Sequence, residues 1–389
     1  MARGLGLADI LRVFGPGYRA THPLSPMQAR AWRAIVDCRT AALGGHVEGC
    51  TTCGTVRHVY HSCRNRHCPL CQTRAKEAWL AARQRELLPV PYFHLVFTLP
   101  HALNAVAARH DRIIYDLLFT AASATLNEFA ANPRWLGGMP AFTLVLHTWK
   151  QDLGRHIHVH ALMAGGAMTE EGKWIPAKQR FLFPVHALST VFRGKFMDAL
   201  VAERRNGPLH RDQALSESIW REMIVQLYQH DWVVYAKQPL GGPAQVLAYL
   251  GRYTHRVAIS NERLLGLHEN HIRLRVRDPA RPKRRRVIEL PADVFITRFL
   301  SHVLPNGFKR IRHYGLLGPA KKTTYLAAAR EALDVPAPQA AVVESVEAFM
   351  QRVARIEWTR CPYCNSGHFV FIEAIMALKS RSSRPRGPP

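Results

Sequence analysis

Acidic residues are scarce in this chain. Its 389 residues include 28 Asp and Glu against 53 Lys and Arg, which leaves a formal net charge of +25. A field of this sign favours a polyanionic partner, and nucleic acid is the first candidate. Long apolar runs are missing as well, because no stretch of about 18 residues is apolar enough to span a bilayer. A membrane partner is therefore not expected.

Three further absences narrow the function. Asp9 and Arg12 interrupt the apolar residues near the N-terminus, so the sequence does not predict a secretory signal peptide. No Walker A pattern is present, and ATP is not an expected partner. No repeat of solenoid period is found. The length suffices for two or three domains, and the expected location is the cytoplasm.

The eight cysteines are therefore expected to be metal ligands rather than disulfides. Cys50-x2-Cys53 and Cys68-x2-Cys71 are two pairs separated by 14 residues. This is the four-thiolate spacing of a zinc ribbon, and Gly54 allows the tight turn after the first pair. The spacing predicts a structural zinc on these four cysteines.

More potential ligands lie near these pairs and far from them. A second tetrahedral site could use Cys38, His46, Cys63 and His67. Alternatively, Cys63 is a buried thiol and the two histidines are solvated. Cys361-x2-Cys364 is a lone pair that either completes a site with distant residues or forms a tight turn with two free thiols.

Three histidines alternate with apolar residues at His156, His158 and His160. In an extended strand, alternate side chains point to one face about 6.5–7 Å apart. Ile157 and Val159 would then enter a core behind the histidines. Imidazole is the commonest metal ligand in proteins, so the run predicts a metal site on a buried strand rather than a solvated histidine-rich strand.

Strands are expected at 92–100, at 142–148 and through the histidine run, with a turn at 152–154 that makes the last two a hairpin. Ser25, Pro26 and Gln28 form a capping box that predicts a helix start. Helical periodicity also covers 73–87, 102–131, 187–204 and 214–228. The fold class is therefore α+β, with a central antiparallel sheet, packed helices and a small preceding zinc-ribbon-like domain. The expected parts are an arm (1–24), a zinc-binding domain (25–88), a main domain (89–318), a C-terminal helical region with a cysteine pair (319–376) and a disordered basic tail (377–389).

Two tyrosines, Tyr249 and Tyr253, lie four residues apart on a predicted helix and so share one face. Gln245 lies one turn earlier on that face, and Arg252 and Arg256 flank the pair. Aromatic residues at this spacing usually belong to a core. A histidine metal site elsewhere in a basic chain favours a functional pair instead.

Together these motifs resemble the HUH endonuclease superfamily, and the whole layout is similar to the rolling-circle, two-tyrosine transposases of the IS91 family. The resemblance extends over about residues 25–318. It rests on these stretches: Cys38 to Thr40, Ser62 to Pro69, Phe97 to Pro100, His156 to His160, Tyr249 to Arg256 and Arg310 to Gly315. One departure is Ile157, where the family often has proline between the first two histidines.

The resemblance implies an HUH-type sheet and a bacterial, nucleoid-associated enzyme that nicks and rejoins single-stranded DNA. His158 and His160 would hold Mg²⁺ or Mn²⁺, and one of Tyr249 or Tyr253 would attack phosphorus to form a 5′-phosphotyrosine. The third ligand is left open among His156, Gln245, Gln151 and Asp152.

DNA contacts are expected from basic residues near these motifs. They come from Arg252 and Arg256, from the cluster 283–286, and from Lys309, Arg310, Arg312 and Tyr314, where an aromatic residue lies among basic ones. Each charge cluster could instead be a solvated face. Two other functions stay open: a plasmid replication initiator or relaxase of the same chemistry, and a non-enzymatic zinc-containing DNA-binding regulator.

Overall fold

The computed structural model describes residues 4–178, 182–240, 245–246, 251, 258–278, 280–281, 284–338, 345–354 and 357–378. The chain divides into two compact units. Unit 1 comprises Met1–Thr73 and Ala340–Pro389, and unit 2 comprises Arg74–Gln339. Both ends of the chain therefore contribute to unit 1. In the part of the chain that the structure describes, no helix is long and apolar enough to cross a membrane.

Unit 1 combines short helices with a three-stranded antiparallel sheet in the order β12-β1-β2. Its elements are α1 (Leu7–Val13), α2 (Gly15–Thr21), α3 (Pro26–Asp37), η1 (Ala41–Leu43), β1 (Gly45–Cys50), β2 (Val56–Tyr60), α12 (Val346–Ala354) and β12 (Phe369–Ile375). The predicted capping box is confirmed, because Ser25 Oγ accepts from Gln28 N at 3.3 Å and Ser25 N donates to Gln28 Oε1 at 3.0 Å. Strand β12 lies in the region expected to be helical, and it joins the sheet by pairing with β1.

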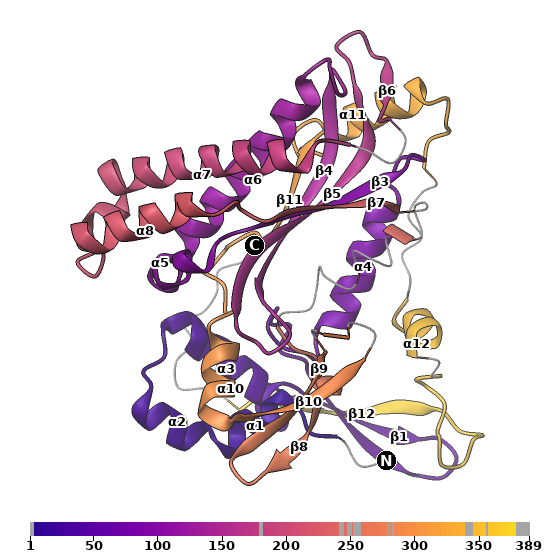
Figure 1. Ribbon diagram of the computed structural model, residues 1–389. Coiled ribbons are helices and arrows are strands. Elements are labelled where there is room, and N and C mark those ends of the chain that lie inside the picture. The colour runs from indigo at the N-terminus through magenta and orange to yellow at the C-terminus, as the bar shows by residue number, and fades with distance from the viewer. Residues whose placement is uncertain are drawn as a thin grey trace. The chain divides into compact units, whose positions relative to one another are not determined.

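The main sheet of unit 2 has the path β11-β4-β5-β3-β7, with β6 paired to β5. The strands are β3 (Tyr92–Thr98), β4 (Met139–Trp149), β5 (Arg155–Met168), β6 (Trp174–Pro176), β7 (Val234–Leu240) and β11 (Ile311–Gly315). Neighbouring strands in this sheet pair antiparallel. The mixed fold with a central antiparallel sheet is therefore confirmed, and the histidine strand β5 is its central strand (Figure 1).

The two faces of this sheet have different cores. Odd-numbered residues of β5 such as Ile157 and Val159 belong to a large apolar core with residues of α6 and α7. Even-numbered residues further along β5, Leu162 and Ala164, belong to a second core that includes side chains of α4 and α11. Figure 1 shows α6 and α7 on one side of the sheet and α4 on the other. The histidines share the parity of the second face.

Helices supply most of the remaining mass of unit 2. They are α4 (Gln72–Gln84), η2 (His101–Leu103), α5 (Asn104–Arg109), α6 (Asp111–Ala131), α7 (Val185–Asn206), η3 (Pro208–Arg211), α8 (Glu217–Gln229) and α11 (Lys322–Ala332). The helical stretch expected over 102–131 is divided at His110, whose backbone leaves the helical region with φ −127° and ψ 49°.

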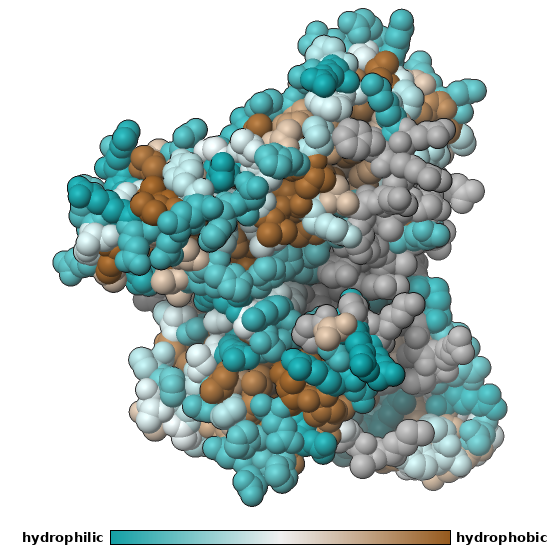
Figure 2. Space-filling model, viewed as in Figure 1, coloured by the Kyte–Doolittle hydropathy of each residue, from teal (hydrophilic) through white to brown (hydrophobic). Residues whose placement is uncertain are grey.

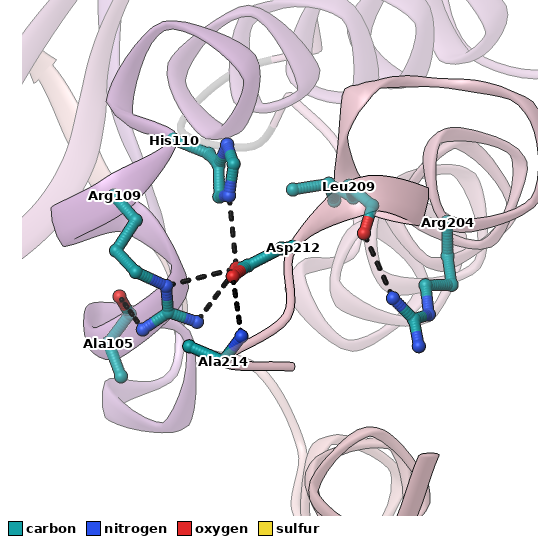
Figure 3. Close-up of polar contacts among 7 residues, drawn as sticks. All are labelled: Ala105, Arg109, His110, Arg204, Leu209, Asp212 and Ala214. Carbon is teal, nitrogen blue, oxygen red and sulfur yellow. Dashed lines mark hydrogen bonds and ion pairs between the residues drawn. The ribbon is translucent and has the colours of Figure 1, made fainter. Parts of the chain in front are cut away.

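A polar cluster explains the break at His110 (Figure 3). The Asp212 Oδ2 atom accepts from Arg109 Nε at 2.9 Å and lies 3.0 Å from His110 Nε2, while Oδ1 accepts from Ala214 N at 3.0 Å. Burial alone would raise the pKa of Asp212. The hydrogen bonds from Arg109 and His110 outweigh burial and hold that pKa below its ordinary value.

A second sheet in unit 2 has the order β10-β9-β8 and is followed by a helix. Its elements are η4 (Asn261–Arg263), β8 (Leu264–His268), β9 (His271–Arg277), β10 (Arg285–Pro291) and α10 (Ala292–Leu300). Burial alternates along β9: Ile272, Leu274 and Val276 are buried, whereas the intervening arginines are exposed. This sheet is therefore amphipathic, with one apolar and one basic face.

Residues around α10 hold the turn between β4 and β5. His302 Nε2 donates to Leu153 O at 2.8 Å, and its Nδ1 accepts from Thr148 Oγ1 at 3.0 Å. Burial lowers the pKa of His302 to about 4, so the ring is neutral and can do both. Arg298 Nη1 adds a bond to Asp152 O at 2.9 Å. The predicted hairpin is confirmed, and its turn is fixed from outside.

Candidate functional site

Three histidines converge on one face of the main sheet. His158 and His160 come from β5, and His147 of β4 lies directly opposite His158 in the strand pairing. The Nε2 atom of His160 is 3.2 Å from His158 Nε2 and 3.1 Å from His147 Nδ1. One ring nitrogen of each of the three lies within 4.8 Å of the others. This donor set suits one divalent ion.

Neighbouring groups orient these rings. His158 Nδ1 donates to the His156 carbonyl at 3.0 Å, which leaves the Nε2 lone pair facing the cluster. His94 Nε2 lies 2.9 Å from His160 Nδ1, so the other nitrogen of His160 is likewise the one available. Burial, followed by the nearby His160 and His156, lowers the pKa of His158 to about 3. His158 is therefore a neutral imidazole, the form that binds metals.

The other residues proposed as the third ligand lie differently. His156 shares the histidine face, but its Nδ1 lies 3.4 Å from His101 Nε2 and it is outside the three-histidine cluster. Asp152 is engaged in the turn, where its Oδ1 accepts from Gly154 N at 3.0 Å. Gln151 lines the cavity near the histidines, and Gln245 is exposed. The third member of the cluster is His147, which sequence reasoning did not name as a candidate ligand.

A cavity of about 780 Å³ opens above the cluster. It is lined by His147, His156, His158, His160, Val96 and Trp149. It is also lined by residues 258–260, by Glu262 and Arg263, and by four residues of β9 and β10, among them Arg275, Arg277 and Arg285. The three-histidine cluster and these arginines therefore line one cavity, which is large enough for a nucleotide-sized ligand.

The proposed nucleophiles Tyr249 and Tyr253 lie outside the described residues, as do Arg252 and Arg256. Residues near them are described. Val246 is fully buried in the core that contains Leu162 and Ala164, on the histidine side of β5. A Cβ added at Gly251 would meet the Leu80 side chain of α4 at 2.9 Å. Both residues therefore pack on the side of the sheet that carries the histidines.

The cysteines of unit 1 form two clusters whose membership differs from the prediction. One cluster contains Cys38, Cys63, Cys68 and Cys71, and the other contains Cys50, Cys53, Cys361 and Cys364. The predicted set of Cys50, Cys53, Cys68 and Cys71 is thus divided between the two. The C-terminal pair, Cys361 and Cys364, lies with the distant Cys50 and Cys53, which agrees with the first of the two interpretations given for it.

The spacing of the sulfur atoms fits tetrahedral zinc. Sγ atoms are 3.4 Å apart for Cys38 and Cys71, and 3.7 Å apart for Cys53 and Cys361. Four thiolates at about 2.3 Å from zinc place neighbouring sulfurs roughly 3.8 Å apart. A disulfide would require about 2.05 Å. Each cluster therefore has the geometry of a four-thiolate zinc site.

The two histidines predicted as zinc ligands have other partners. His46 Nε2 lies 2.9 Å from Glu48 Oε1, and His67 Nδ1 lies 3.0 Å from Asn65 Oδ1. Neither ring belongs to a cysteine cluster. The expected Cys38, His46, Cys63, His67 site is replaced by one in which Cys68 and Cys71 take the histidine positions.

The predicted DNA contacts around β11 are also placed differently. Arg312 pairs with Asp116, and its guanidinium lies 4.1 Å from the Phe119 ring centroid. Tyr314 stacks on Phe142 at a centroid distance of 5.2 Å. Arg312 and Tyr314 pair with Leu144 and Phe142 of β4, which belong to the large core on the face of the sheet away from the histidines. Arg310 is buried, and Lys309 is exposed.

Comparison with known proteins decides the family. A family model described as "Putative transposase" matches residues 141–324, and the model of a transposase zinc-binding domain matches residues 10–99. The chain is 44% identical over 383 residues to "Putative transposase y4qJ" of Sinorhizobium fredii, with 96% of each chain covered. This chain belongs to the IS91 family of transposases.

A second relative carries a fuller description. The transposase is 27% identical over 354 residues to the "Transposase for insertion sequence element IS801" of Pseudomonas savastanoi pv. phaseolicola, covering 88% of this chain and 83% of that protein. No solved structure gives a significant match. The transposase match includes all three clustered histidines, and the zinc-binding match includes six of the eight clustered cysteines. The protein is thus an enzyme that acts on DNA and contains a zinc-binding domain.

Proposed function

We propose that this transposase nicks and rejoins single-stranded DNA by metal-assisted tyrosine transesterification, and so moves an insertion sequence by a rolling-circle-like route. The observation that carries the proposal is the cluster of His147, His158 and His160 at the floor of a cavity with an arginine-rich wall. A cluster of three imidazoles with ordered outer partners supports a divalent-metal site. A basic wall opposite it suits a phosphodiester substrate.

The three histidines would hold Mn²⁺ or Mg²⁺. Three nitrogen donors are softer than the oxygen donors that Mg²⁺ prefers, so Mn²⁺ is the better match. When bound, the ion polarises and orients the scissile phosphate. The protein's own part is to fix the ligands: His94 and the His156 carbonyl hold the rings of His160 and His158 with one nitrogen aimed at the ion.

Tyr249 or Tyr253 supplies the nucleophile in this proposal. The phenol oxygen bonds to phosphorus, the bond from phosphorus to the 3′ oxygen breaks, and the phenol proton is transferred to the leaving oxygen. The products are a 5′-phosphotyrosine and a free 3′-OH. The exchange conserves phosphodiester bonds, so it needs no ATP. A second tyrosine permits a second, linked strand transfer.

A covalent adduct tests this function. Purified protein is incubated with Mn²⁺ and single-stranded oligonucleotides drawn from DNA flanking the coding sequence, then denatured and separated by electrophoresis. We expect a 3′-end label to remain with the protein and a 5′-end label to be released, with matched duplexes reacting poorly. A protein that binds these strands but forms no adduct would instead be a DNA-binding regulator.

The two cysteine clusters are proposed as structural zinc sites, since four thiolates leave no open position on the metal. Elemental analysis of the purified protein should find two zinc ions per chain. Cys361→Ser removes a ligand from the second cluster and should lower the content to about one zinc, with loss of folded protein because metal binding supplies folding energy.

His46→Gln is the matched control for the zinc content. This histidine lies on β1 near the second cluster but outside it, so two zinc ions should remain. A wild-type content of one zinc, or zinc loss in the His46 variant alone, would contradict the assignment of the clusters.

A further inference from the structure

The basic face of the sheet β10-β9-β8 carries several exposed arginines. Arg273, Arg275 and Arg277 alternate along β9 with buried residues and are exposed. Glu289 lies opposite Arg273, 3.4 Å from its Nε, and neutralises it. No ion pair is seen for Arg275, Arg277 or Arg285 among the residues that the structure describes.

The pairing of these strands adds a cost. Arg277 lies directly opposite Arg285, and Arg275 lies opposite Val287. Like charges directly opposite each other destabilise a sheet. Figure 2 shows strongly hydrophilic side chains gathered over one end of β9 and β10. An arrangement that repels itself in the free protein is explained if an anion occupies it in the working state.

The location of these arginines shows where such an anion would bind. Arg275, Arg277 and Arg285 line the same cavity as the histidine cluster, and Arg263, Lys150 and a single carboxylate, Glu262, are among its other lining residues. The Arg273–Glu289 pair is on the same face of the sheet but does not line the cavity. On this face, the arginines for which the described residues show no ion pair are therefore the ones that line the cavity of the proposed cleavage site.

The wall is held in place relative to the histidine hairpin. Arg263 donates from Nε to Arg275 O at 3.0 Å and from Nη2 to Gln151 O. Arg298 bonds the same turn through Asp152 O at 2.9 Å. The Arg263 side chain therefore joins β9 to the β4–β5 turn, and the Arg298 side chain of α10 adds a second bond to that turn. A ligand held on one side is positioned against the other.

We propose that Arg275, Arg277 and Arg285 form a phosphate clamp that holds the backbone of the DNA strand across from the histidine cluster. The inference rests on the proposed function, which supplies the single strand as ligand. Guanidinium groups can bind a phosphate through two parallel hydrogen bonds. The clamp contacts the backbone phosphates beside the scissile one, so it positions the strand in the cavity without reading base sequence.

Salt dependence of binding tests the clamp. Affinity of the full-length protein for a fluorescent single-stranded oligonucleotide is measured without divalent metal over a range of salt concentrations. Each lost phosphate contact lowers the slope of log K against log salt by about 0.7 for single strands. The Arg275→Gln/Arg277→Gln variant should lose about 1.4 from the slope, and Arg285→Gln alone about 0.7.

Arg273→Gln is the matched control, because it removes the same charge from the same face of β9 where Glu289 already neutralises it. Its slope should stay at the wild-type value. Thermal unfolding should show the double variant at least as stable as wild type, since a like-charge pair is removed. An unchanged slope in the double variant, or an equal drop in the Arg273 variant, overturns the clamp.

The binding readout needs no cleavage, so failure of the two proposals can be told apart. A reduced slope in a protein that never forms an adduct supports the clamp and refutes the chemistry. If the wild-type protein forms the adduct and the clamp variants keep the wild-type salt slope, the chemistry is supported and the clamp is refuted. A clamp that contacts only backbone phosphates does not distinguish bases, so its variants should lose affinity for unrelated DNA sequences by the same factor. A loss of affinity that depends on the DNA sequence would refute backbone recognition.

Discussion

Replacing both Tyr249 and Tyr253 with phenylalanine is expected to abolish covalent attachment to DNA. Phenylalanine keeps the aromatic ring but removes the phenol oxygen that the proposal assigns as the nucleophile. Affinity for single-stranded DNA should stay near the wild-type value, because binding rests mainly on phosphate contacts. Adduct yield on denaturing gels and binding by fluorescence anisotropy, measured on the same preparations, give the two readouts.

Single replacements separate the roles of the two tyrosines. If one tyrosine initiates and the other completes the transfer, one single variant should lose the first adduct and the other should lose only the rejoined product. We favour Tyr249 as the initiating residue. A double variant that still attaches to DNA at the wild-type yield would require another nucleophile.

His147→Ala is expected to reduce adduct formation by at least about 100-fold, since residues that merely orient a ligand already cost 10–100-fold when removed. Among the described residues, His147 supplies one of the three ring nitrogens in the cluster. The loss should appear as a higher Mn²⁺ concentration needed for half-maximal adduct yield, measured by titrating the ion. Binding of the single strand without metal should be retained. Calorimetric titration of Mn²⁺ gives the affinity directly.

His156→Ala is the control for that variant. His156 lies on the same strand and face as His158, but its ring nitrogen faces His101 rather than the cluster. Manganese affinity should change little, provided the His156 carbonyl that orients His158 stays in place. Equal losses in both variants would indicate that His156, not His147, completes the site.

Local sequence signals predicted much of the sheet. Alternation at 156–160 and the turn at 152–154 were enough to expect an antiparallel hairpin with histidines on one face. The partner His147 was within reach of the same reasoning, because it lies at the end of the predicted strand 142–148. Its pairing with His158 depends on an irregularity between His147 and Trp149, which no sequence pattern indicated.

The zinc sites show a different limit. Cysteine pairs reveal ligand type and local turns, but they do not say which pairs share an ion. Cys361 and Cys364 return from 308 and 314 residues away to join Cys53 and Cys50. Strand β12 brings them there by pairing with β1. Partner choice is therefore set by long-range strand pairing, and nearest-neighbour spacing combined the wrong pairs.

The basic residues near the C-terminal end of unit 2 illustrate the role of strand parity. Arg312 and Tyr314 resembled a single-strand groove because a basic and an aromatic residue alternate. In β11, that alternation places both on the face of the large core, while His313 takes the opposite face and bonds Thr143 Oγ1 at 2.8 Å. Charge pattern alone does not reveal the face; the register with β4 does.

Mapping the DNA-linked residue tests the central claim most directly. Trypsin cleaves after Lys237, Arg252 and Arg256, so Tyr249 falls in the peptide 238–252 and Tyr253 in the peptide 253–256. After nuclease trimming of the wild-type adduct, mass spectrometry should find a nucleotide phosphate on one of these two peptides, on the tyrosine oxygen. A nucleotide found only on a peptide other than 238–252 and 253–256, or no nucleotide-modified peptide at all, would contradict tyrosine transesterification in this transposase.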